Sequence, residues 1–202
     1  MDTTQLQAQE SFTVRRLTNP AVKRYSVTSA RPDGSAGETV AFAEQKALTP
    51  TERTTVWTDE SRERVLCTFE AGRALDLGAV YTVRDDEGNA LGTFHEKPVA
   101  SLLRTTWVLG RPGHEDLTGR ERNAAVAVLR RVWDFLPFTD FVPFLWPHHF
   151  DFTEGADAGK RGMTVDRRFG LRARYVIRLT GPGLDRRLAI AQAVALDALR
   201  SD

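Results

Sequence analysis

Cysteine is almost missing from this sequence, since Cys67 is the single one among 202 residues. An internal disulfide is therefore excluded, and the composition fits a reducing compartment. Histidine is also scarce: the four histidines form no HExxH motif, and a lone cysteine forms no CxxC pair. His148 and His149 lie close to Asp151 in the sequence, but neighbouring residues of a strand point to opposite faces. We expect no metal site and no cofactor.

The sequence also lacks the motifs of common catalytic sites. It contains no GxSxG nucleophile motif and no GxGxxG or GxxxxGK[ST] phosphate-binding loop. Cys67 lies in the apolar segment VLCTF, which favours a small buried hydrophobic residue over a nucleophile. We expect a non-enzymatic protein with no catalytic residue.

Net charge and long apolar runs are missing as well. Lys and Arg number 28 and Asp and Glu number 27, so the formal net charge is +1. This balance provides no global attraction to nucleic acid, and we expect no nucleic-acid partner. No apolar run reaches the roughly 20 residues of a membrane span, and residues 1–14 lack the basic and apolar regions of a signal peptide. We expect a cytoplasmic protein without a transmembrane span, either free or peripheral at the membrane.

What the chain does contain is a series of short, β-rich segments separated by turn formers. Alternating apolar residues predict strands at residues 11–17, 22–29, 39–46, 54–58, 65–69, 80–84, 90–95, 104–109, 149–153, 162–167 and 172–179. The clearest hairpin surrounds DDEGN at residues 85–89, where Asp and Gly supply side-chain caps and a positive φ. Residues 1–10 are predicted to be a flexible tail, and residues 11–202 a single domain.

Two segments predict helices. Residues 120–134, RERNAAVAVLRRVWD, lack Gly and Pro and place apolar side chains at helical spacing. Residues 184–199, LDRRLAIAQAVALDAL, are apolar around the whole circumference, because Gln192 is the only strongly polar residue between Leu188 and Leu196. Such a helix is buried in protein or in a membrane, and this one is too short for a membrane span. We therefore predict a sheet wrapped around the C-terminal helix.

The run YTVRDDEGNALGTFHEKPVASLLRTTW, with the later VDRRFGLRARYVIRL and LDRRLAIAQAVALDAL, resembles the LURP-one-related and phospholipid-scramblase proteins of the tubby-like superfamily. The resemblance implies a mainly β fold, a closed antiparallel barrel of about twelve strands wrapped around a buried C-terminal helix. It also implies binding of phospholipid headgroups by basic residues on the barrel wall. It does not extend to lipid translocation, because the cysteine cluster and the calcium-binding acidic segment of eukaryotic scramblases are missing.

One candidate binding site is a cluster of arginines near the end of the predicted barrel. Alternation along one strand places Arg172 and Arg174 on one face, and a hairpin partner would bring Arg167 or Arg168 beside them. Such a cluster would grip a phosphate with two hydrogen bonds from each guanidinium. The alternative is a solvated barrel exterior in which these arginines pair with Asp and Glu. The full candidate set is Arg161, Arg167, Arg168, Arg172 and Arg174.

The second candidate is the aromatic, proline-punctuated segment FLPFTDFVPFLWP at residues 135–147. If it is exposed, Phe138, Phe141, Phe144 and Trp146 form a contact surface for a partner or a membrane. If it folds back, the same side chains plug one mouth of the barrel.

These observations predict a non-enzymatic binding module whose partner is an anionic phospholipid headgroup or a protein. The alternative is a regulatory or protein-interaction barrel with no small-molecule ligand. An enzyme on this fold would instead require an internal pocket with a perturbed carboxylate or histidine.

Overall fold

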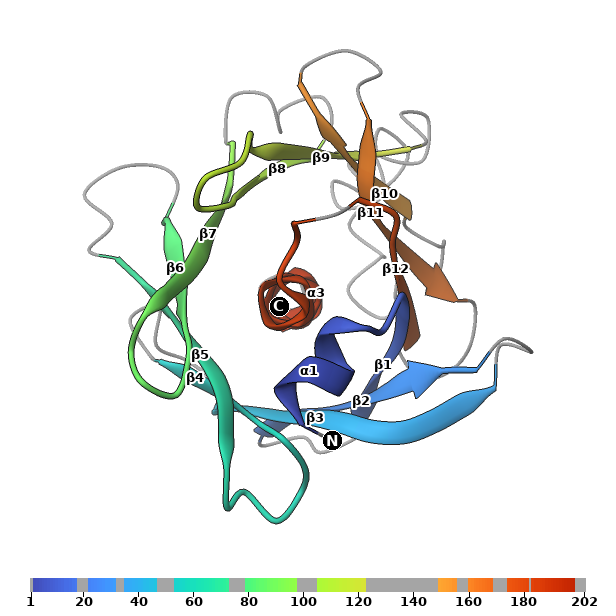
Figure 1. Ribbon diagram of the computed structural model, residues 1–202, viewed down its shortest axis with the longest axis vertical. Helices are drawn as coiled ribbons and strands as arrows, with labels where there is room; N and C mark the ends of the chain where they lie inside the picture. The colour runs from blue at the N-terminus through green and yellow to red at the C-terminus, as the bar shows by residue number, and fades with distance from the viewer. Residues whose placement is uncertain are drawn as a thin grey trace, which may run out of the picture.

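The computed structural model describes residues 2–17, 22–31, 35–46, 53–72, 79–97, 105–122, 149–155, 160–168, 174–181 and 183–198. Within them, antiparallel strands form a closed barrel around a C-terminal helix (Figure 1). Each strand pairs with the next one along the chain, and the last strand pairs with the first. The predicted fold class is therefore confirmed.

The twelve strands are β1 (Ser11–Leu17), β2 (Val22–Ala30), β3 (Ala36–Lys46), β4 (Thr54–Trp57), β5 (Val65–Ala71), β6 (Tyr81–Arg84), β7 (Ala90–Glu96), β8 (Thr106–Gly110), β9 (Leu117–Glu121), β10 (His149–Glu154), β11 (Arg161–Arg168) and β12 (Arg174–Leu179). The helices within the described residues are α1 (Thr3–Gln7) and α3 (Arg186–Ala198). The turn at DDEGN joins β6 to β7 as predicted, and Asp85 caps it by accepting hydrogen bonds from the backbone of Glu87 and Asn89.

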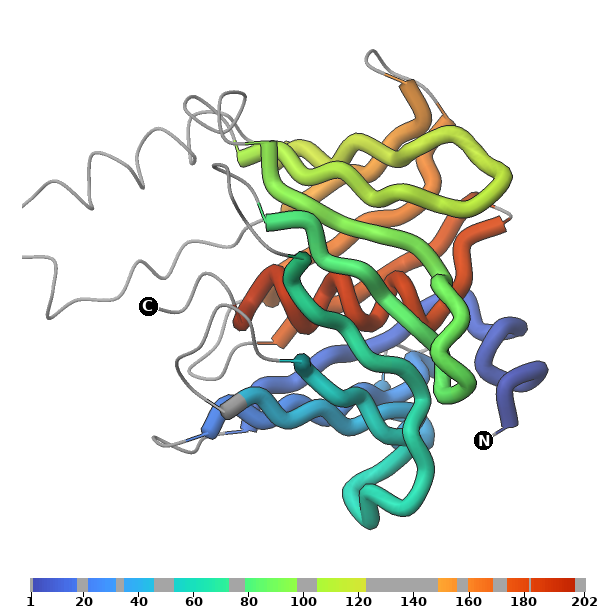
Figure 2. The backbone as a smooth tube through the Cα atoms, turned by 90° about the vertical axis from the view of Figure 1, so that its left-hand side faces the viewer, coloured from blue at the N-terminus to red at the C-terminus, as the bar shows by residue number. Residues whose placement is uncertain are grey.

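Helix α3 runs along the axis of the barrel, which Figure 1 shows end-on and Figure 2 from the side. Every residue of α3 from Leu188 to Ala198 is buried, so the apolar circumference of the helix faces strands on all sides. Gly92 on β7 allows a close approach, since a Cβ atom there would lie 2.6 Å from Leu188 Cδ2. The predicted buried helix is confirmed.

The alternation of each strand separates the barrel interior from its outer wall. On β1, Phe12 and Val14 point inward and are fully buried, whereas Arg15 is exposed. On β12, Tyr175 and Ile177 point inward between the exposed Arg174 and Arg178. The two faces of one strand therefore carry different chemistry.

A helix was expected over residues 120–134, but the first two of these residues belong to a strand. Leu117 and Glu121 are buried within β9, which pairs with β8 on one side and β10 on the other. Arg120 and Glu121 therefore belong to a strand, because pairing on both sides outweighs the helical preference of a charged, alanine-rich segment. Residues 123–134 lie outside the described residues.

In place of the flexible tail expected over residues 1–10, the structure has the short helix α1. Asp2 caps it: the backbone N–H of Gln5 donates to Asp2 Oδ1 at 2.7 Å, and the N–H of Asp2 donates back to Gln5 Oε1. Leu6 is 2% exposed and joins the barrel core. One apolar side chain and a capping box thus order this end of the chain.

Candidate anion-binding groove

Three arginines form a row across neighbouring strands on the outer wall of the barrel. Arg15 of β1 lies opposite Arg174 of β12, and Arg174 lies opposite Arg168 of β11. All three are exposed. Since adjacent strands are about 4.8 Å apart, the row spans about 10 Å of sheet. We call these residues the arginine row.

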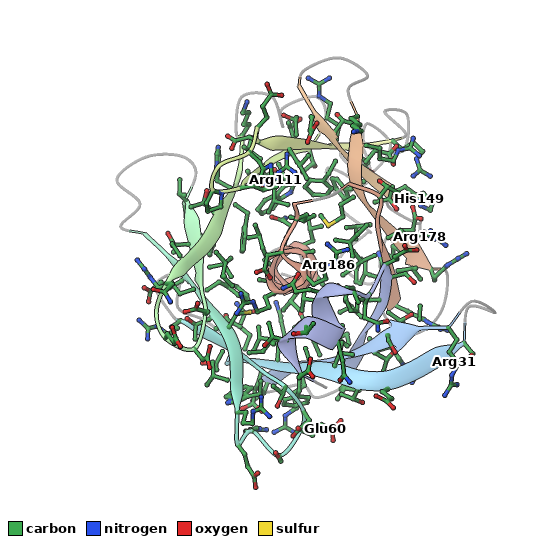
Figure 3. All side chains as sticks on the ribbon, viewed as in Figure 1. Arg31, Glu60, Arg111, His149, Arg178 and Arg186 are labelled. Atoms are coloured by element: carbon green, nitrogen blue, oxygen red, sulfur yellow. The ribbon has the colours of Figure 1, made fainter. Side chains whose placement is uncertain are left out.

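The arginine row borders an open groove of about 890 Å³ along the outer face of β1 and β12. Its cationic lining consists of Arg31, Arg168, Arg174 and Arg178, and its acidic lining is Glu10. Figure 3 places Arg31 and Arg178 on the same side of the barrel, away from the central helix. The chain as a whole is nearly neutral, so the positive charge is local to this groove.

The arginines of the groove and of the arginine row differ in their partners. The charge of Arg178 is compensated, since it donates to Asp166 Oδ2 at 2.7 Å, whereas Arg31 donates to a neutral acceptor, the backbone oxygen of Ala36, at 2.8 Å. Arg15, Arg168 and Arg174 make no hydrogen bond or ion pair with another described residue. Like charges directly opposite each other destabilise a sheet, so the arginine row favours an anion from outside.

An adjacent network on β10 and β11 has its charges paired. Asp166 accepts from Arg178, and its other oxygen lies 2.8 Å from His149 Nδ1. Asp151 receives two hydrogen bonds from Arg122, at 2.6 and 2.9 Å. These hydrogen bonds hold the pKa of the Asp151 carboxyl below its ordinary value. We call this set the paired network.

The arginines predicted from the sequence separate into three groups. Arg168 and Arg174 lie opposite each other on β11 and β12 and line the groove. Arg161 lies at the far end of β11, 4.0 Å from Asp151, and belongs to the paired network. Arg167 is opposite Tyr175, a residue that points into the barrel, so it lies on the inner face. Arg172 lies outside the described residues.

Three arginines at this site were not predicted from the sequence: Arg31 and Arg178, which line the groove, and Arg15, which belongs to the arginine row beside it. Alternation alone places Arg15 on the face opposite Phe12 and Val14, but no local signal pairs β1 with β12. The aromatic candidates Phe138, Phe141, Phe144 and Trp146 lie outside the described residues, so their two interpretations stay open.

Cys67 is a core residue. It is fully buried, and its Sγ lies 3.9 Å from the backbone oxygen of Arg187. Burial raises the pKa of the thiol to about 12, so the thiolate required of a nucleophile is disfavoured. The described residues contain no group of three His, Cys, Asp or Glu side chains suited to hold a metal ion.

The C-terminal end of α3 is held inside the barrel by a buried carboxylate. Asp197 accepts hydrogen bonds from the hydroxyls of Tyr25, at 2.9 Å, and Tyr175, at 2.5 Å. Arg16 lies 3.6 Å away, and Lys23 donates to the backbone oxygen of Ala198. Burial and the neighbouring Asp197 raise the pKa of Tyr25, which keeps its hydroxyl a donor. This cluster anchors the helix.

A closed barrel of twelve antiparallel strands around a buried C-terminal helix is the architecture of the tubby-like class. Within that class, the model of the LURP-one-related family matches residues 39–197. The chain belongs to the LURP-one-related family, as the sequence resemblance indicated. A comparison with curated proteins found no match. None of the helices in the described ranges has the length and apolar character needed to cross a membrane.

Proposed function

We propose that the groove binds an anionic phospholipid headgroup, so that the protein acts as a non-enzymatic recognition module at a membrane surface. The observation that supports this most strongly is the arginine row. Arg15, Arg168 and Arg174 lie side by side without a compensating partner among the described residues. In the paired network, by contrast, Arg122 and Arg178 are compensated by Asp151 and Asp166.

The chemistry of guanidinium fits a phosphate ligand. Each arginine presents a planar fork of N–H donors that matches two phosphate oxygens, and the hydrogen bonds are strengthened by charge. Arginines on adjacent strands offer such forks at intervals of about 4.8 Å. A headgroup with more than one phosphate would therefore engage more than one member of the arginine row.

The size and placement of the groove also support a headgroup. A volume of about 890 Å³ falls within the range of roughly 300–1,000 Å³ that small-molecule sites occupy. The groove is open on the outer wall, which leaves the acyl chains of a lipid outside the protein. Attraction to an anionic surface contributes about 1 kcal/mol for each basic residue near it and weakens in salt.

The test is cosedimentation with vesicles of phosphatidylcholine alone or of phosphatidylcholine with phosphatidylinositol bisphosphate, an anionic lipid that clusters of basic residues recognise. The variant carries Arg15→Gln, Arg168→Gln and Arg174→Gln. A matched control carries Arg53→Gln, Arg84→Gln and Arg120→Gln, which removes the same charge elsewhere on the barrel. We expect salt-sensitive binding in the wild type and the control, and none in the arginine-row variant.

Two results would contradict the proposal. Equal loss of binding in both variants would mean that net charge, not this groove, governs attachment. If the wild type does not bind anionic vesicles at low salt, a lipid ligand is excluded. That result would favour the alternative, a protein-interaction barrel, and its partner would then be sought by affinity purification.

A further inference from the structure

The N-terminal residues 2–11 contribute both to the mouth of the barrel and to the lining of the groove. Helix α1 lies at the mouth of the barrel where α3 begins (Figures 1 and 2). The residues that follow it, from Ala8 to Ser11, form one wall of the groove. Arg168, Arg174 and Arg178 line the same groove, and Arg178 is the cross-strand partner of Ser11.

Helix α1 is docked by contacts to the first turn of α3. Gln7 Nε2 donates to Asp185 Oδ1 at 2.9 Å, and Gln7 Oε1 accepts from the backbone N–H of Arg186 at 3.1 Å. That N–H is one of the donors that the start of a helix leaves without an intrahelical partner. Leu6 adds the apolar contact, since it is 2% exposed within the barrel core.

The groove wall depends on this docking. Arg186 Nε donates to the backbone oxygen of Gln9 at 3.0 Å, and the N–H of Leu179 donates to the oxygen of Glu10 at 2.9 Å. These bonds hold the connection between α1 and β1 against α3 and the end of β12. If α1 leaves the barrel mouth, the contacts of Gln7 with α3 are lost and that of Gln9 is weakened, so the wall is held mainly by the bond between Leu179 and Glu10.

Helix α1 has five residues, and a helix of that length is unstable in water unless tertiary contacts hold it. Its docking is therefore a local equilibrium, of the kind that amide exchange measures. We propose that docking of α1 and occupancy of the groove by an anion are coupled: the anion stabilises the docked helix, and undocking weakens anion binding. This inference rests on the proposed function of the groove. Coupling is reciprocal, so one factor describes both effects.

The experiment measures the coupling between helix docking and anion binding in two ways. In the wild type, amide hydrogen exchange of residues 2–10 is followed with and without vesicles that contain phosphatidylinositol bisphosphate. Separately, vesicle affinity is compared for wild type, Leu6→Ala and Thr4→Ala, where Thr4 is an exposed residue of the same helix. We expect exchange at residues 2–10 to slow about fivefold or more. Leu6→Ala should weaken binding by a similar factor, and Thr4→Ala should bind as the wild type does.

The outcomes separate this inference from the proposed function. Vesicle binding with unchanged exchange at residues 2–10 and full affinity in Leu6→Ala would overturn the coupling and leave the groove as a binding site. A wild type that does not bind would overturn both. If Leu6→Ala fails to fold, the exchange measurement on the wild type decides alone.

Discussion

The inner and outer faces of β1, β11 and β12 differ in whether their charged side chains have partners of opposite charge. On the inner face, Arg16 and Tyr175 hold the buried Asp197. On the outer face, their sequence neighbours Arg15 and Arg174 have no compensating partner among the described residues. Inside a barrel an unpaired charge prevents folding, whereas on a solvated wall it costs little. The arginines without a compensating partner among the described residues therefore lie on the outer wall, where a ligand from solvent can reach them.

The largest expected effect comes from putting a charge on the inner side. Ala193 is fully buried on α3, so Ala193→Asp places a carboxylate inside the barrel without a partner. We expect the free energy of unfolding to fall by more than about 4 kcal/mol, which would leave the protein unfolded or aggregated. Circular dichroism during thermal unfolding measures this.

The matched change on the outer face is Arg174→Asp. It places the same carboxylate between Arg15 and Arg168, where new ion pairs form across the strands. This variant should fold and melt at or slightly above the wild-type temperature. If Ala193→Asp melts like the wild type, α3 is not the core.

The next effect concerns the anchor of α3. Asp197→Ala leaves the hydroxyls of Tyr25 and Tyr175 buried without their acceptor and removes the carboxylate near Arg16. We expect urea denaturation to show a loss of about 2–3 kcal/mol. Asp197→Asn keeps an acceptor oxygen and should lose less; equal losses would mean that the hydroxyl contacts contribute little.

A smaller effect of opposite sign is expected at Gln192. Its amide is fully buried on α3, and neither its oxygen nor its nitrogen has a hydrogen-bond partner among the described residues. Gln192→Leu removes this unsatisfied amide at similar volume and should raise the free energy of unfolding by about 1 kcal/mol. A lower stability in Gln192→Leu would show that the amide is satisfied by a buried water.

The smallest expected effect on stability lies in the groove. Arg174→Gln relieves repulsion with Arg15 and Arg168 and should raise stability by up to about 0.5 kcal/mol. Arg178→Gln breaks the 2.7 Å contact with Asp166 and should lower stability by a similar amount. Urea denaturation of the two variants side by side measures the difference; the same sign in both would remove the distinction between unpaired and paired arginines.

Much of this fold is predictable because it depends on local patterns. Alternation along each strand, the turn at DDEGN and the apolar circumference of residues 188–196 each follow from neighbouring residues. Strand β9 was not predicted from the sequence. Of its three buried positions only Leu117 is a large apolar residue, and the other two are Gly119 and Glu121. Helix α1 depends on one leucine and a capping box, which is a weak signal within the mostly polar residues 1–10.

The candidate site was predictable only in part, for a physical reason. Arg168 and Arg174 belong to one hairpin, so their proximity follows from β11 and β12 alone. Arg15 reaches them only because the barrel closes, which pairs the first strand with the last. The register of that closure is set by packing around α3 and not by any local sequence signal.

The most direct measurement is a nuclear magnetic resonance titration that follows the arginine side-chain Nε–H signals as a soluble inositol trisphosphate headgroup is added. We expect the signals of Arg15, Arg168 and Arg174 to shift together and saturate, while those of Arg53 and Arg122 stay in place. Signals that do not move, or that move equally around the whole barrel, would contradict a binding site at the arginine row.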